Sequence, residues 1–448
     1  MPSPQTSGAV PRRGESGFSL TELMVSLAVT VALLLAILAV VETGGRVSRV
    51  EQQVANMNQA LRASQRIMAQ HVRMAGRGGL PRSLPGLAVA GGPSLTVRNN
   101  VGEGGGSRDL APGLAGTPQV VEGTDVLTIR GVFDAPIYQV NSSLPQTFVL
   151  TPTDDDPATA TGGTVILTNP GPAGIPQDLT RIRNAIANQI PEALVLVSSL
   201  GGTVYAVVEL DPAASDVTDF PDRVTVGFRV TGGTHTAAYR TLYPLPAGGG
   251  SLPDSFRAVS SLGLLEEHRY YVREEFAVPG DDTSDLRPVL TRARMFPATE
   301  TPWSDDPANT RVDLADFILD LQVALGYDSS LGGFFEQDAN NVDGDDQILE
   351  TADGSQDDWL FNAAADDPTR APWVPPWAVG NPRPELYYVR LTTLGRTAAR
   401  ERNYVAPPLV ALEDRVYGEA ATPASEQNRI DRMAHRNVLR TVVEMRNL

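Results

Sequence analysis

The chain contains no cysteine and no lysine among its 448 residues. The absence of cysteine excludes disulfides, thiolate catalysis and cysteine-ligated zinc or iron–sulfur sites. Stability must therefore come from the size of the core or from a metal held by other ligands. Because lysine is absent, all 36 basic residues are arginine. A GC-rich genome explains this bias more simply than a functional requirement does.

Positive charge is also scarce, with 36 basic against 53 acidic residues and a formal net charge of −17. This balance argues against a general nucleic-acid surface, which needs a basic face. Hydrophobic residues make up 42% of the chain, enough for one large core or two ordinary ones. The four histidines show no paired metal-ligand spacing: His71, His235, His268 and His435.

One long hydrophobic run stands near the N-terminus. Residues 1–17 are polar and include Arg12 and Arg13, and the following Phe18–Val41 contains a single charge, Glu22. At about 1.5 Å per residue, these 24 residues span a bilayer core of about 30 Å with some tilt. The positive-inside rule then predicts a cytoplasmic N-terminus, with the rest of the chain outside the cytoplasm.

Two ordinary explanations of this run fit poorly. A secretory signal peptide has a short apolar region followed by a small-residue cleavage site, whereas here the small residue, Gly17, precedes a long apolar run. A plain membrane anchor does not explain Glu22, because an acid inside a span is costly and usually functional.

The stretch Gly17-Phe18-Ser19-Leu20-Thr21-Glu22 resembles the type IV prepilin signature. The resemblance implies that a prepilin peptidase cleaves between Gly17 and Phe18 and that Phe18 becomes N-methylated. It also implies an assembly role for Glu22, which would neutralise the N-terminal amine of a neighbouring subunit. Opposite charges in a low-dielectric bundle are costly alone and tolerable together, which agrees with that role.

A second helical pattern follows Gly44-Gly45, a pair that would let the two halves of the helix bend. Apolar or small residues recur at spacings of three and four, with His71 the doubtful member. The seam consists of Val47, Val50, Val54, Met57, Leu61, Ser64, Met68, His71 and Ala75. We interpret it as the face that packs on the globular domain, and His71 as structural rather than a ligand. Glycines at 76, 78 and 79 and Pro81 end the helix, so residues 18–78 form the predicted pilin helix.

Residues 79–448 read as a β-rich domain of short alternating segments between Gly, Pro, Asp and Ser. The predicted strands are Asp125–Val132, Thr203–Leu210, Arg223–Val230, Tyr270–Val278, Glu385–Leu391 and Val438–Met445, while Leu314–Leu325 suits a strand or a short helix. Such alternation indicates antiparallel sheets. The predicted fold is α+β and type IV pilin-like: a long N-terminal helix, its first half transmembrane (18–41), packed on a large antiparallel domain with insertions.

Four stretches resemble the PilW-type minor pilins: His71–Pro81, Gly123–Gly131, Ala315–Asp328 and His435–Leu448. The J-type pseudopilins of type II secretion share much of this pattern. The chain is longer than either group, with extra residues at about 134–200 and an acidic insertion at about 328–384, and it lacks the cysteines that such domains often carry.

The resemblance implies a minor pilin that helps to prime pilus assembly at the tip and supports motility or adhesion. Its expected partners are the prepilin peptidase, other minor and major pilins, the inner-membrane assembly platform and, before assembly, membrane lipid. The expected location is the inner membrane with a periplasmic C-terminal domain, then the pilus tip at the cell surface. A J-type pseudopilin, or an adhesive module on a pilin anchor, are the alternatives.

The acidic insertion contains a degenerate EF-hand-like pattern around Gly344. Calcium takes six to eight oxygen ligands, and this segment offers them close together. Ala339 occupies the first ligand position and cannot serve, so a merely solvated acidic loop is the alternative. The candidate calcium ligands are Asp338, Asn341, Asp343, Asp345 and Glu350.

No catalytic motif was recognised, so an enzyme is the least favoured class. The glycine-rich segments at 102–107 and 248–251 lack the lysine of a phosphate-binding loop, and no nucleophile elbow or His-Glu-x-x-His occurs. Aromatic residues gather among prolines at Trp359, Phe361, Trp373 and Trp377. Packing is the default explanation for them, and an adhesive surface is the alternative.

Overall fold

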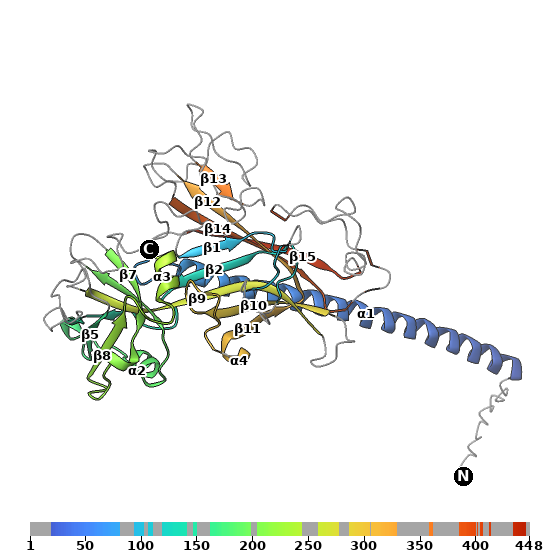
Figure 1. Cartoon of the computed structure of the whole chain (residues 1–448). Coiled ribbons are helices and arrows are strands. Elements are labelled where there is room, and N and C mark those ends of the chain that lie inside the picture. Colours follow the sequence, from blue (N-terminus) through green and yellow to red (C-terminus); the bar gives the residue numbers. More distant parts are fainter. Residues whose placement is uncertain are drawn as a thin grey trace, which may run out of the picture. The chain divides into compact units, whose positions relative to one another are not determined.

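The computed structural model describes residues 19–80, 94–102, 106–110, 119–140, 147–149, 162–198, 204–243, 259–276, 286–304, 306–328, 358–361, 385–399, 401, 404–405, 412–413 and 433–444. By its internal contacts the chain divides into two units, Met1–Asn56 and Met57–Leu448. The boundary falls within the long first helix, α1 (Leu20–Arg73), drawn in blue in Figure 1. Each unit is treated by itself below.

Within the first unit, α1 runs from Leu20 through the glycine pair without a break in its helical assignment. A Cβ added to Gly44 or Gly45 would meet nothing within 4 Å, so no contact requires glycine at either position. The proposed bend at this pair therefore stays a prediction.

In the second unit, the rest of α1 buries one face. The buried residues follow helical spacing: Met57, Leu61, Ser64, Gln65, Met68, Ala69, His71 and Val72. The predicted seam is thus confirmed from Met57 onward, whereas Val47 remains 51% exposed. Gly76, Gly78 and Gly79 adopt positive φ angles after the helix, a conformation that glycine reaches without the strain of a side chain. They terminate α1 as the sequence predicts.

The larger sheet has eleven strands, of which eight form a continuous order. That order is β1 (Leu95–Arg98), β2 (Val126–Gly131), β9 (Val259–Phe276), β6 (Ala193–Ser198), β7 (Val204–Leu210), β8 (Arg223–Arg229), β5 (Gly162–Thr168) and β4 (Thr147–Val149). Three more strands branch from it: β3 (Tyr138–Gln139), β10 (Leu286–Met295) and β11 (Arg311–Asp316). All the pairings are antiparallel, as predicted.

Strand β9 is the longest strand, with 18 residues, and it organises this sheet (Figure 1). Its first half pairs with β6, from Val259 to Leu265. Its second half pairs with β2 on one side and with β10 on the other. The sequence predicted only the part that begins at Tyr270, because the preceding residues mix charged and apolar side chains and hide the period of two.

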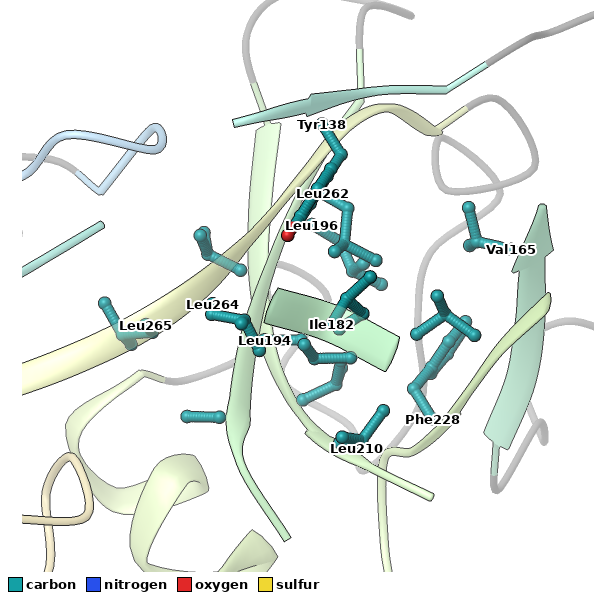
Figure 2. Close-up of a cluster of buried hydrophobic side chains, with 14 of the residues drawn as sticks. Tyr138, Val165, Ile182, Leu194, Leu196, Leu210, Phe228, Leu262, Leu264 and Leu265 are labelled. Carbon is teal, nitrogen blue, oxygen red and sulfur yellow. The ribbon is translucent and has the colours of Figure 1, made fainter. Parts of the chain in front are cut away.

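A hydrophobic core lies around β5 to β9 and the short helices α2 (Thr180–Ala187) and α3 (Thr236–Leu242). Figure 2 shows side chains from β6, β9 and α2 converging, among them Leu194, Leu264 and Ile182, and all three are fully buried. On β8, Val224, Val226 and Phe228 are buried together, which confirms the predicted alternation. Burying each such side chain contributes about 1.5–3 kcal/mol, so this cluster is a main source of stability.

A second sheet has the order β13 (Asp358–Phe361), β12 (Ile318–Asp328), β14 (Glu385–Arg396) and β15 (Arg436–Glu444). The segment that suited a strand or a helix is thus strand, divided between β11 and β12 at Phe317, which has a φ of 60°. A β-strand β13 within the acidic insertion was not predicted. The short helix α4 (Pro307–Thr310) precedes β11.

The α1 face packs against this second sheet through a buried amide. The Gln65 Nε2 lies 2.9 Å from Thr393 Oγ1 and donates to the carbonyl oxygens of Leu391 (3.2 Å) and Leu439 (2.6 Å). Gly395 packs closely against Leu61, because a Cβ added to this glycine would lie 3.1 Å from the leucine side chain. A long N-terminal helix and a large antiparallel domain are therefore present, in agreement with an α+β fold.

Candidate functional site

The N-terminal end of α1 is closed by a reciprocal pair of hydrogen bonds. The Ser19 Oγ accepts from the backbone N–H of Glu22 (3.2 Å), and the Glu22 carboxylate accepts from the backbone N–H of Ser19 (3.1 Å). This is a capping box, in which two side chains satisfy two otherwise unpaired donors of the first turn. The Ser-x-x-Glu spacing in the sequence indicates such a capping box, but from the sequence we interpreted only the negative charge of Glu22. Gly17 and Phe18 lie outside the described residues.

Between Leu23 and Val41, α1 is largely apolar on every side and exposed. Its large side chains between Leu20 and Val41 are 47–77% exposed. One window of 18 residues in α1 has a mean hydropathy of 2.9 and no buried residue, so by length and composition this helix could span a membrane. An exposed run of this kind needs an apolar environment, either lipid or other helices.

The predicted calcium ligands, Asp338 to Glu350, lie outside the part of the chain that the structure describes. Their place in the topology is nevertheless fixed at both ends. Strand β12 ends at Asp328 and β13 begins at Asp358, and these two residues are register partners. The acidic segment therefore connects two adjacent antiparallel strands. Of the four clustered aromatics, Trp359 and Phe361 lie on β13, and the other two fall outside the described ranges.

Strand β9 carries charged side chains on both faces at its centre. On one face, Glu267 is fully buried and accepts from Arg130 Nε (2.6 Å) and Arg269 (2.8 Å). Arg269 also pairs with Glu300 at 2.9 Å. Burial alone would raise the pKa of Glu267, but Arg130 and Arg269 outweigh burial and hold it below its usual value. The carboxylate is thus ionised and serves as a structural centre.

The other face of β9 carries Glu266, His268 and Tyr270, because alternate residues of a strand share a face. Asp134, three residues beyond β2, donates its backbone N–H to Glu266 at 3.0 Å. His71, from the last turn of α1, lies with its Nδ1 against the Tyr270 hydroxyl. We call these five residues the β9 polar cluster.

Aromatic contacts hold the cluster together. The ring centroids of His71 and His268 are 5.1 Å apart, and both rings stack on Phe133, at 5.2 and 4.8 Å. Burial, with the Arg292 guanidinium second, lowers the pKa of His71 to about 4 and that of His268 well below its usual value. Both imidazoles are therefore neutral at neutral pH.

Ligand-forming atoms also meet in this cluster. One donor atom each from Asp134, Glu266 and His268 lies within 4.8 Å of the other two. Glu266 additionally pairs with Arg294 (3.1 Å) and Arg181 (3.3 Å) through Oε1. No spacing along the chain revealed this group, because it joins a loop and a strand 132 residues apart. The only local signal is the alternation Glu266-x-His268 within a strand.

The other two histidines make separate ring contacts. His235 stacks on Phe296 with 4.5 Å between ring centroids, and His435 stacks on Tyr404 at 3.9 Å. His71, the doubtful member of the predicted seam, is buried at 8% exposure, and its structural role rather than a ligand role stays a prediction. Its proximity to a second histidine was not predicted.

No protein-family model, no curated protein and no solved structure matches the chain.

Proposed function

We propose that the chain is a minor pilin of a type IV pilus, cleaved between Gly17 and Phe18 and incorporated through the apolar half of α1. The observation that carries the proposal is the exposed apolar half of α1, Leu20–Val41, whose single acid, Glu22, stands in the first turn. A neutral glutamine could make the same capping box, whereas an acid at that depth in lipid is costly, so a helix that only anchored a domain would gain nothing from the charge. A helix that leaves the bilayer for a bundle of like helices gains a partner for a neighbouring N-terminal amine.

The layout of the chain supports the same reading. Processing would leave α1 at the new N-terminus, followed by an antiparallel domain with its own core. The domain would then be displayed in the periplasm and finally at the pilus tip, where it would contact other minor and major pilins. The peptidase and the inner-membrane assembly platform would act on the chain before that.

A J-type pseudopilin of a type II secretion system is the second candidate, because the N-terminal features serve either filament. An adhesive role on the same anchor is favoured by one observation: strand β13, which contains Trp359 and Phe361 and follows the acidic segment in the chain, forms the edge of the second sheet. Binding of purified protein to glycans or surfaces would reveal such a role.

Mass spectrometry of sheared surface filaments, beside the membrane fraction of the same cells, tests the proposal. We expect a low-abundance chain that begins at N-methylated Phe18 in the filaments. A processed chain found only in membranes favours the pseudopilus. A chain with an intact N-terminus in both fractions contradicts a pilin function altogether.

A further inference from the structure

We propose that Asp134, Glu266 and His268 of the β9 polar cluster bind one divalent transition-metal ion of the zinc class. The proposal does not depend on the pilin function. It concerns the second unit alone, and it differs in residues and in metal type from the calcium prediction for the acidic segment.

The donor atoms are already gathered. One atom from each of the three side chains lies within 4.8 Å of the other two. Ligands bound to zinc at about 2.0–2.2 Å lie about 3.3–3.6 Å apart, so the three must approach by about 1 Å. Asp134 can supply this movement, because it lies on a loop and is exposed, whereas Glu266 and His268 are fixed on β9.

The histidine provides an independent sign of a missing partner. His268 is 1% exposed, and its Nδ1 is buried with no hydrogen-bond partner among the described residues. Buried polar atoms are nearly always paired, so an unpaired one calls for a ligand, an ion or a water. The ring is also held in place by its stack on Phe133, which fixes a ligand before the metal arrives.

The donor set selects the class of metal. Calcium needs six to eight oxygens, and two carboxylates with one imidazole do not supply them. Imidazole nitrogen with carboxylate oxygen suits zinc and its neighbours in the transition series. Three protein ligands leave a fourth position for water.

Nearby arginines lower the expected affinity of this site for a metal ion. Arg294 and Arg181 occupy Oε1 of Glu266, while Oε2 accepts the backbone N–H of Asp134. Arg292 acts electrostatically on both His71 and His268. These positive charges oppose a cation, so removing one should strengthen binding. An increase in affinity upon loss of a positive charge is a signature that a purely structural cluster would not show.

The proposal is tested by measuring zinc binding to the full-length protein in detergent. The protein is first stripped of metal with a chelator and then titrated with zinc in the presence of excess calcium. The excess calcium suppresses binding of zinc by the acidic segment. We expect one equivalent of zinc in the wild type and at least about a tenfold loss of affinity in Asp134→Asn. Asp178→Asn is the matched control, because Asp178 is also exposed and accepts from the backbone N–H of Thr180, which an amide oxygen also does.

Two further variants complete the test. Arg292→Gln should bind zinc more tightly than the wild type, and His268→Gln should lose the site while its thermal unfolding reports whether the fold survives. Unchanged zinc affinity in Asp134→Asn, or weaker binding in Arg292→Gln, would overturn the proposal. A wild-type protein that binds no zinc would overturn it as well, and would leave water as the partner of His268.

Discussion

At the scale of single residues, Glu22 shows how one side chain can serve two purposes. Its carboxylate accepts from the Ser19 N–H and so closes the first turn of α1. The same carboxylate is the charge expected to meet the amine of a neighbouring subunit. The two purposes compete for the same oxygens, because a carboxylate turned toward a neighbour no longer caps its own helix.

Two substitutions at this position separate charge from capping. Glutamine keeps an acceptor for the Ser19 N–H but removes the charge, and valine removes both. We expect Glu22→Gln and Glu22→Val alike to be cleaved after Gly17 yet poorly incorporated into filaments, as measured by immunoblots of sheared and membrane fractions. If Glu22→Gln is incorporated normally and Glu22→Val is not, capping rather than charge neutralisation is the function of this residue.

Asp211 provides a prediction for pH. It pairs with Arg229 through two bonds of 2.7 and 2.9 Å and accepts from Ala213 N. Burial opposes ionisation, but the bonds from Arg229 outweigh it and lower the pKa of Asp211. Its stabilising contribution is thus complete above the unfolded-state pKa of about 3.9 and is lost as the pH falls through the lower folded-state value.

Asp211→Asn should therefore unfold at lower temperature than the wild type at pH 7, and this difference should shrink as the pH falls below about 4. Melting temperatures measured across that range provide the check. Asp222→Asn, a substitution in the nearby turn, is the comparison. A difference in melting temperature that is constant with pH would show that the Asp211–Arg229 pair is not the cause.

At the scale of elements, the sequence predicted α1 and the clear strands because their patterns are local. On β8, alternation places Val224 and Val226 on one face, and burial confirms it. The β9 polar cluster could not be predicted, because Asp134 and His268 meet only after β2 and β9 pair. Likewise, the Gln65 amide finds its partners on β14 and β15, more than 300 residues away.

Gln65 should be the most sensitive polar residue on the buried face of α1. It is 2% exposed, and its truncation leaves the carbonyl oxygens of Leu391 and Leu439 without this donor. We expect Gln65→Ala to lower the free energy of unfolding by about 1–3 kcal/mol, measured by denaturant unfolding. The exposed Gln52→Ala should have little effect, and equal effects would contradict the importance of the buried amide.

The glycine pair tests whether α1 needs to bend. Because Gly44 and Gly45 are helical and a Cβ would meet nothing, alanine at both should stabilise the helix by about 1 kcal/mol each. Circular dichroism should show equal or greater helix content. If bending matters for assembly, the variant with alanine at both positions should be cleaved normally but incorporated less into filaments. Normal incorporation of this variant would show that assembly does not need a bend at the glycine pair.

At the scale of the whole molecule, the two units differ in what stabilises them. The first unit exposes its apolar side chains, and the second has its own hydrophobic cores. We expect a fragment of residues 57–448 to be soluble without detergent and to unfold in a cooperative transition, as seen by calorimetry. Aggregation of this fragment, with no transition, would show that the second unit depends on the first.

The length of β9 has a consequence for a chain that is pulled through α1. After α1, the chain is bonded to β2 through Gly76 N to Arg130 O and Val132 N to Arg77 O, and β2 is bonded to β9. A force applied along α1 is therefore transmitted to β9, an 18-residue strand that is also hydrogen-bonded to β6 and β10. When the force is directed along the strands, many interstrand hydrogen bonds must break at the same time. We therefore expect this domain to resist forced extension better than its thermal stability alone suggests.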